Sequence, residues 1–113
     1  MELKRVVVTG LGALTPIGNT YQEFWEGLMN GVSGAAPITL FDATLFKTQF
    51  ACEIKNFNIE DYFDRKEARK IDRCAQLGII AAREAIKHSG ILEDVNTNKE
   101  RIGVIWGSGI GGI

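Results

Sequence analysis

The sequence predicts an α/β fold, because strand-like and helix-like segments alternate along its 113 residues. Residues 5–10 form a β-branched run that ends at a glycine, which is typical of a strand buried on both faces. Residues 101–106 form a second apolar run, and a glycine-rich loop follows it. Two segments with helix-start signals lie between these runs. This order of segments is typical of an α/β domain.

The first helix is predicted from Thr20 to about Met29. A loop with several Gly and Pro residues, 11–19, separates it from the first strand. Thr20 and Glu23 have the spacing of a capping box, and Gly31 is a plausible stop. We expect one face of this helix to be buried through three apolar residues, Phe24, Trp25 and Leu28.

The middle of the chain, residues 33–63, carries few regular signals. Its exception is residues 50–54, where large and small or polar side chains alternate in the period of a strand. The sequence therefore predicts a short strand whose buried face carries Phe50, Cys52 and Ile54.

A long second helix is predicted between Asp64 and Gly90. Asp64 and Glu67 form another capping box, and Gly90 closes the helix. Residues 74–86 are mostly apolar, so we expect them to be buried on most sides. Such a helix needs more surrounding protein than about 110 residues provide. We therefore expect this chain to be a piece of a larger protein.

The composition excludes several classes of function. Thirteen Lys and Arg residues stand against 14 Asp and Glu, so no global field favours nucleic acid or membrane. The apolar runs are far shorter than the ~20 residues that cross a bilayer. Two cysteines give no disulfide framework. We expect a cytoplasmic protein.

Four cations follow the second capping box at helical spacing: Lys66, Arg69, Lys70 and Arg73. On one continuous helix they would share a face over two turns. Charge runs of this kind are usually solvated helix faces. The alternative interpretation is a docking strip for an acidic partner.

Two glycine loops invite a nucleotide-binding interpretation. The Gly10–Gly12 loop follows the first strand, and residues 107–112 fit the pattern G-x-G-x-x-G. In a dinucleotide fold the helix starts inside the glycine motif, whereas here it starts only near Thr20. A lone G-x-G-x-x-G is weak evidence, so we expect no cofactor.

The two cysteines and the single histidine are not predicted to be catalytic or to bind a metal. Cys52 lies in a strand-like segment and Cys74 in an apolar helix, so we expect both to be structural and buried. His88, the single histidine, is expected to be a surface or capping residue in the last helical turn.

The chain as a whole resembles the N-terminal part of the β-ketoacyl-acyl-carrier-protein synthases, most closely the synthase II type. The resemblance rests on segments that occur in family order and at family spacing. These are residues 5–12 and 15–19; Trp25, Leu28, Gly31, Ser33 and Gly34; Phe41 and Asp42; residues 65–67 and 69–72; and residues 101–103 and 107–112.

The resemblance implies a thiolase-like fold with the layers α-β-α-β-α, normally in a homodimer. Residues 1–113 would be the N-terminal part of its first domain. Enzymes of this family join an acyl group, held on a cysteine, to a malonyl unit that loses carbon dioxide. The family pattern places the catalytic cysteine and two histidines beyond Ile113, so no catalytic residue is expected in this chain.

The resemblance also assigns supporting roles to residues that are present. Lys66, Arg69 and Lys70 match basic contacts to the acidic acyl carrier protein, and Arg73 extends them. Ile110 matches a position that lines the acyl-chain pocket. No nucleic acid, membrane, metal or cofactor is implied.

The competing interpretation is a small binding module. It would use the glycine loops for a nucleotide or the basic residues for an acidic partner, and it predicts that 113 residues fold alone.

Overall fold

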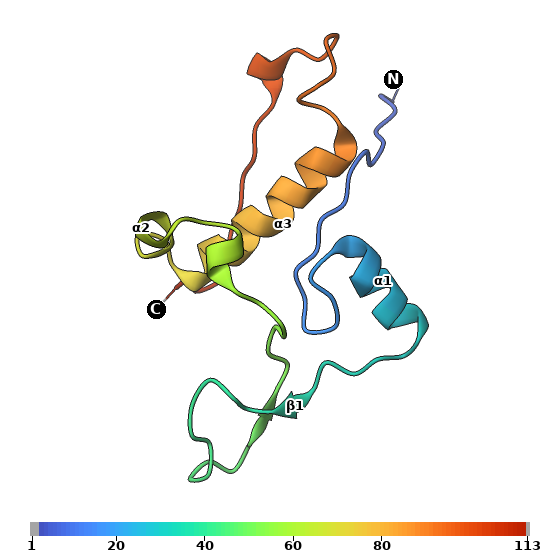
Figure 1. Ribbon diagram of the computed structural model, residues 1–113. Coiled ribbons are helices and arrows are strands. Elements are labelled where there is room, and N and C mark those ends of the chain that lie inside the picture. The colour runs from blue at the N-terminus through green and yellow to red at the C-terminus, as the bar shows by residue number, and fades with distance from the viewer. Residues whose placement is uncertain (1–2, 113) are drawn as a thin grey trace.

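The computed structural model describes residues 3–112. Its longest element is helix α3 (Arg73–Ser89), which the rest of the chain surrounds on several sides (Figure 1). The elements that precede α3 are, in order, α1 (Tyr21–Met29), β1 (Ala36–Pro37), β2 (Phe50–Ala51), the 3-10 helix η1 (Ile59–Asp61) and α2 (Arg65–Ala68). A second 3-10 helix, η2 (Lys99–Arg101), follows it.

Helix α1 begins as the sequence predicts. The hydroxyl of Thr20 accepts a hydrogen bond from the backbone N–H of Glu23 at 3.2 Å. The carboxylate of Glu23 reaches back to the N–H of Asn19 at 2.7 Å, one residue earlier than in a standard capping box. The helix ends at Met29 with Asn30 as its cap. The predicted bounds of this helix are confirmed.

The predicted buried stripe of α1 is wrong for two of its residues. Trp25 is 62% exposed, and Leu28 is exposed as well. The reason is that α1 contacts the chain through Gly27, which packs against Ile17. Only Phe24 of the predicted stripe is half-buried.

The single long helix predicted from Asp64 to Gly90 is wrong, because the chain forms two helices there. Asp72 accepts the N–H of Ala75 at 2.7 Å and starts α3 as a new N-cap. Helix α2 is therefore only four residues long. Gly90 closes α3 as predicted, with a left-handed backbone (φ 63°).

Three predicted strands are absent or shorter in the described residues. Within residues 3–112 the named strands form one two-stranded antiparallel sheet, with Ala36 opposite Ala51. Residues 5–10 and 101–106 have no strand pairing, and Val6 is 90% exposed and Ile105 99%. A strand needs a neighbour to satisfy its backbone groups, and neither segment has one within the described residues.

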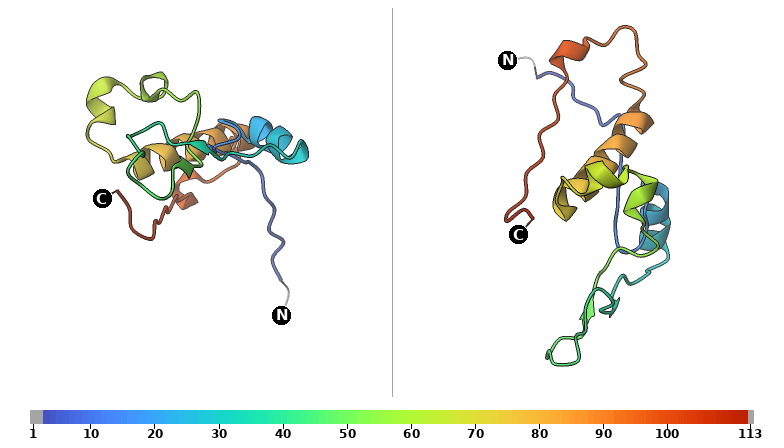
Figure 2. Two further views of the ribbon diagram at one scale, coloured as in Figure 1. Left: turned by 90° about the horizontal axis from the view of Figure 1, so that it is seen from below. Right: turned by 60° about the vertical axis from the view of Figure 1, so that its left-hand side comes forward.

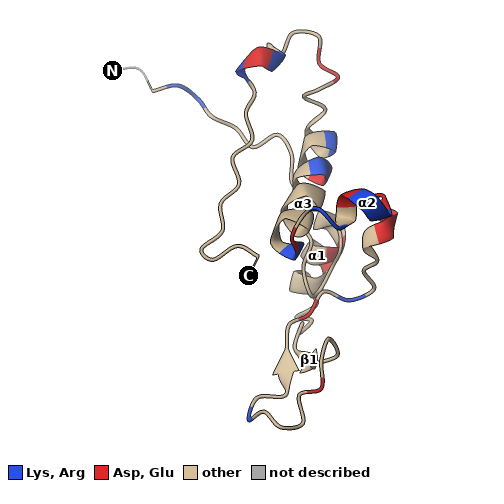
Figure 3. Ribbon diagram, turned by 90° about the vertical axis from the view of Figure 1, so that its left-hand side faces the viewer, with Lys and Arg blue, Asp and Glu red and all other residues tan. Residues whose placement is uncertain are grey.

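Small residues on one face of α3 let the extended segments approach closely. A Cβ atom added at Gly12 would lie 2.8 Å from the backbone nitrogen of Ala85, so the loop passes directly over the helix. The indole of Trp106 lies on Gly78 in the same way, 2.8 Å from where a Cβ would be. Figures 2 and 3 show both extended segments on the same side of α3.

The described chain has almost no hydrophobic core. Its buried apolar residues are Ala43, Phe63 and Ile80, and most apolar residues of α3 are only half-buried, contrary to prediction. Its radius of gyration is 17.5 Å, whereas a compact chain of this length has about 13 Å. Its accessible surface is 9547 Å², against roughly 6,100 Å² for a folded protein of its mass.

Candidate functional site

The four predicted basic residues do not share one helix face. Lys66 lies in α2, Arg69 caps its end, Lys70 lies in the following turn, and Arg73 is the first residue of α3. All four are exposed. The stripe is broken because Asp72 starts a second helix, so the helical spacing of the sequence does not apply across this turn.

Lys66, Arg69 and Lys70 are nevertheless brought together, because one short segment carries them. Asp64 fixes its start by accepting the N–H groups of Lys66 at 2.7 Å and Glu67 at 3.1 Å. Helix α2, at the outer edge of the molecule, carries both basic and acidic residues (Figure 3). We define these three cations as the basic cluster. An exposed cluster of this kind can attract an acidic surface.

Arg73 has a different environment from the basic cluster. Its guanidinium lies over the ring of Phe57, 4.3 Å from the ring centroid. Phe57 in turn stacks on Tyr62 with centroids 5.6 Å apart. A guanidinium over an aromatic face is held by a cation–π interaction. Arg73 therefore packs against the chain before α2, which argues against including it with the basic cluster.

Ile110 lies in the glycine-rich loop near the C-terminal end of the chain, and its side chain is 78% exposed. The hydroxyl of Ser108 accepts the N–H of Gly111 at 3.1 Å within this loop. A Cβ added at Gly112 would lie 2.9 Å from a carboxylate oxygen of Asp72. The loop thus reaches the N-cap of α3, two residues after Lys70. Ile113 lies outside the described residues.

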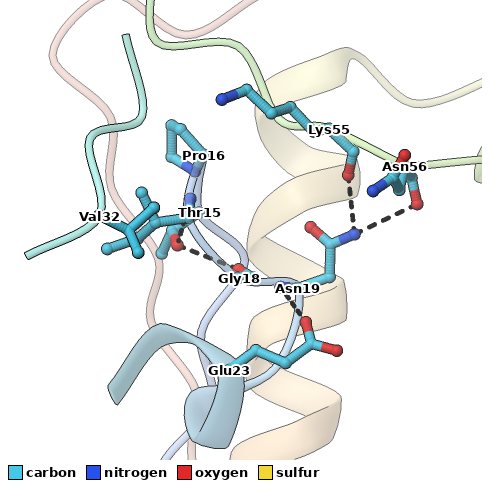
Figure 4. Close-up of a pocket in the computed structure, with 9 residues that line it drawn as sticks. Thr15, Pro16, Gly18, Asn19, Glu23, Val32, Lys55 and Asn56 are labelled. Carbon is cyan, nitrogen blue, oxygen red and sulfur yellow. Dashed lines mark hydrogen bonds between the residues drawn. The ribbon is translucent and has the colours of Figure 1, made fainter. Parts of the chain in front are cut away.

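A polar cavity of about 340 Å³ lies between the loop before α1 and the chain after β2 (Figure 4). The side-chain amide of Asn19 donates to the backbone oxygens of Lys55 at 2.9 Å and Asn56 at 3.2 Å. In Figure 4 the amino end of Lys55 points away from Asn19. The polar atoms of Asn19 therefore join two segments of the chain.

The first glycine loop offers no cradle for a phosphate. The N–H of Leu11 donates to Nδ1 of His88 at 3.0 Å, and the N–H of Ala13 donates to the carboxylate of Glu84 at 2.8 Å. Both amides are therefore used within the chain, and a carboxylate lies where an anion would bind. This geometry argues against the nucleotide-binding interpretation of that loop.

His88 has a structural role that sequence reasoning missed. It lies exposed in the last turn of α3, as predicted. Its ring also stacks on Tyr21, with centroids 4.4 Å apart and planes within 7°. Because Nδ1 accepts the N–H of Leu11, the imidazole joins α3 to both the first glycine loop and α1. The local sequence carries no signal for such a tertiary contact.

The expected burial of the cysteines is wrong for Cys52, which is exposed because β2 ends at Ala51. Cys74 is half-buried and lies in the first turn of α3, where the sequence placed it inside a longer helix. It is about 21 Å from His88 along the axis of α3, given a rise of 1.5 Å per residue. These two residues therefore cannot form a catalytic pair.

Among residues 3–112, no three His, Cys, Asp or Glu side chains group closely enough to hold a metal ion. The helices in this part of the chain are also too short or too polar to cross a bilayer.

Comparison with known families identifies the chain. Residues 3–113 match the family described as "Beta-ketoacyl synthase, N-terminal domain". The chain belongs to this family. The resemblance inferred from the basic motif and the glycine-rich loops is confirmed.

Curated relatives of this synthase domain are named 3-oxoacyl-[acyl-carrier-protein] synthase 2. The protein from Staphylococcus aureus strain COL is 52% identical over 97% of the chain, and the protein from Synechocystis is 47% identical over all of it. The chain spans 26% and 27% of the lengths of these two relatives. A solved structure, "The ishigamide ketosynthase/chain length factor", is 36% identical with a TM-score of 0.69. The match covers 78% of this chain and 22% of that one.

Proposed function

We propose that this chain is the N-terminal part of the first domain of a 3-oxoacyl-[acyl-carrier-protein] synthase of type II. The observation that carries the proposal is the 52% identity to a synthase of that name across nearly the whole chain. The exposed apolar segments around Val6 and Ile105 support it, because a longer chain would bury them. In that protein they would be strands of an α-β-α-β-α sandwich, and two such chains would form a cytoplasmic homodimer.

The proposed reaction is a decarboxylative condensation. An acyl group moves from acyl carrier protein to a cysteine thiol of the longer protein, and the carrier leaves as a free thiol that takes up the proton. Malonyl carrier protein then loses carbon dioxide, and the electron pair of the broken C–C bond remains on the α-carbon. This carbon attacks the acyl thioester, the new C–C bond forms, and the C–S bond to the cysteine breaks. The products are 3-oxoacyl carrier protein and a free thiolate.

The residues of this chain would position the substrates of that reaction. We propose that Lys66, Arg69 and Lys70 bind the acidic surface of acyl carrier protein, and that Ile110 lines the pocket for the acyl chain. The contact between Gly112 and Asp72 supports this pair of roles, because it places the loop of Ile110 beside the segment that carries the basic cluster. A docked carrier would then lie near the loop that contacts its acyl chain.

Charge reversal in the longer protein tests this function. We expect wild type to convert acyl and malonyl carrier protein to 3-oxoacyl carrier protein, detected by mass spectrometry. In Lys66→Glu and Arg69→Glu, KM for malonyl carrier protein should rise about tenfold with little change in kcat, because a docking charge acts on association. Lys47→Glu is the matched control, since Lys47 is exposed and lies in the loop between β1 and β2.

Two outcomes would contradict the proposal. The absence of any 3-oxoacyl product from wild type would refute the condensing activity. A rise in KM as large for Lys47→Glu as for Lys66→Glu would show that net charge matters and that the basic cluster does not.

A further inference from the structure

Helix α3 holds the far end of α2 through Gln76. The side-chain amide of Gln76 donates to the backbone oxygen of Ala68 at 2.8 Å and to that of Ile71 at 3.2 Å. Ala68 is the last residue of α2, and Ile71 immediately precedes the N-cap of α3. One part-buried side chain therefore satisfies carbonyl groups on both sides of Arg69 and Lys70.

The same helix holds the near end of α2 through Arg83. Its Nη1 donates to the backbone oxygen of Tyr62 at 3.0 Å, and its guanidinium lies 4.7 Å from the ring centroid of Phe63. Phe63 is only 6% exposed, so it is one of the few buried apolar residues of the described chain. The next residue, Asp64, is the N-cap of α2. Arg83 thus fixes the backbone immediately before the basic cluster.

Gln76 and Arg83 are seven residues apart, so they lie on the same face of α3. Together they hold the segment between Tyr62 and Ile71, which contains the whole basic cluster. The segment needs such support, because a helix of four residues is not stable on its own.

We propose that Gln76 and Arg83 are positioning residues for carrier-protein docking. They hold α2 against α3, so that Lys66, Arg69 and Lys70 meet the carrier in one preformed arrangement. Preorganised groups bind more tightly because less conformational freedom is lost on association. This inference rests on the proposed function, and it adds two residues that do not themselves contact the carrier.

Substitutions that leave the net charge unchanged can distinguish positioning from simple electrostatic attraction. Gln76→Leu removes two hydrogen bonds with no change of charge. Arg83→Lys keeps the positive charge, but its side chain is one atom shorter and lacks the planar guanidinium that lies over the ring of Phe63. The control is Lys87→Gln, which removes a cation one turn further along α3, on its exposed surface.

The experiment uses the longer protein and measures KM and kcat with malonyl carrier protein and with a malonyl thioester of N-acetylcysteamine, which has no carrier. We expect KM for the carrier substrate to rise about threefold to tenfold in Gln76→Leu and Arg83→Lys, as for the loss of one or two hydrogen bonds. The kcat value, and kcat/KM for the carrier-free thioester, should stay within twofold of wild type. Lys87→Gln should behave as wild type.

The possible failures are distinguishable. If carrier protein shows no measurable affinity for wild type by titration calorimetry, the proposed docking itself is wrong. If wild type binds and both variants bind equally well, Gln76 and Arg83 have no positioning role. If the variants lose activity equally with both substrates, their role is in general stability, and the inference is overturned. Arg83→Lys retains the long side chain, so it also serves as the variant that preserves folding.

Discussion

The two sides of α3 are held by different kinds of interaction. On the side of α1 and α2, its polar side chains bind backbone groups directly: Glu84 accepts the N–H groups of Ala13 at 2.8 Å and Tyr21 at 3.0 Å. On the other side, residues 5–10 and 102–106 touch the helix through glycines and Trp106 but have no strand partner in the described part of the chain. The first side is specified by contacts within the chain. The segments on the second side would be buried only if additional protein covered them.

The largest expected effect comes from placing a charge in the unpaired segment. Val7→Asp in the longer protein should lower the free energy of unfolding by more than about 4 kcal/mol, because a buried carboxylate without a partner is among the most costly substitutions. The same change in the 113-residue chain should have no measurable effect, since Val7 is exposed there. Urea unfolding of the longer protein and amide exchange of the short chain measure the two cases.

Val7→Thr is the control, because it nearly keeps the shape of the side chain and adds no charge. A longer protein that tolerates Val7→Asp would show that this segment stays exposed. The proposed sandwich, in which the segment is a buried strand, would then be wrong.

A smaller effect is expected on the polar side of α3. Glu84→Gln should lower the free energy of unfolding of the longer protein by about 2 kcal/mol. The carboxylate accepts hydrogen bonds from two backbone N–H groups, and in the variant one of these N–H groups would face the NH2 group of the glutamine instead. Glu93→Gln, an exposed substitution just beyond α3, should change it by less than about 0.5 kcal/mol. Equal values for the two variants, measured by urea unfolding, would contradict the assigned role of Glu84.

The predicted elements that formed are those with local signals. Thr20, Asp64 and Gly90 act as the caps that the sequence indicates, because capping uses side chains and backbone only a few residues apart. Asp72 carries a signal of the same kind directly before the apolar run, but the prediction of one helix from Asp64 to Gly90 does not use it. Strand pairing for residues 5–10 depends on distant segments, so no local pattern could establish it.

The site was predictable only in part for the same reason. The resemblance identified Lys66, Arg69 and Lys70, and the structure places them on one short segment. Helical spacing grouped Arg73 with them, although its guanidinium lies on Phe57. Gln76 and Arg83 act through backbone oxygens of a neighbouring segment. Such acceptors exist in every sequence, so these two roles become visible only in three dimensions.

The smallest expected effect lies at the β1–β2 hairpin, where one carboxylate just after β2 binds the start of the loop that follows β1. Glu53 accepts the hydroxyl of Thr39 at 2.7 Å and the N–H groups of Thr39 at 3.1 Å and Leu40 at 3.3 Å. The hydrogen bond from the hydroxyl of Thr39 is the main cause that lowers the pKa of Glu53 below its ordinary value of 4.5. The carboxylate of Glu53 is therefore protonated at lower pH in the folded hairpin than in the unfolded chain.

This stabilisation is fully present above the ordinary pKa of 4.5 and is lost as pH falls through the lowered pKa of the folded hairpin. We expect the Thr39 amide to shift in NMR spectra over that acid range, and Glu53→Gln to abolish the shift. Glu26→Gln, a neutralisation in α1, should leave the titration of Thr39 unchanged. The effect on global stability should be small, because the carboxylate is solvent-screened. A Thr39 amide that titrates identically in Glu53→Gln would show that another group reports there and that the hairpin does not depend on this carboxylate.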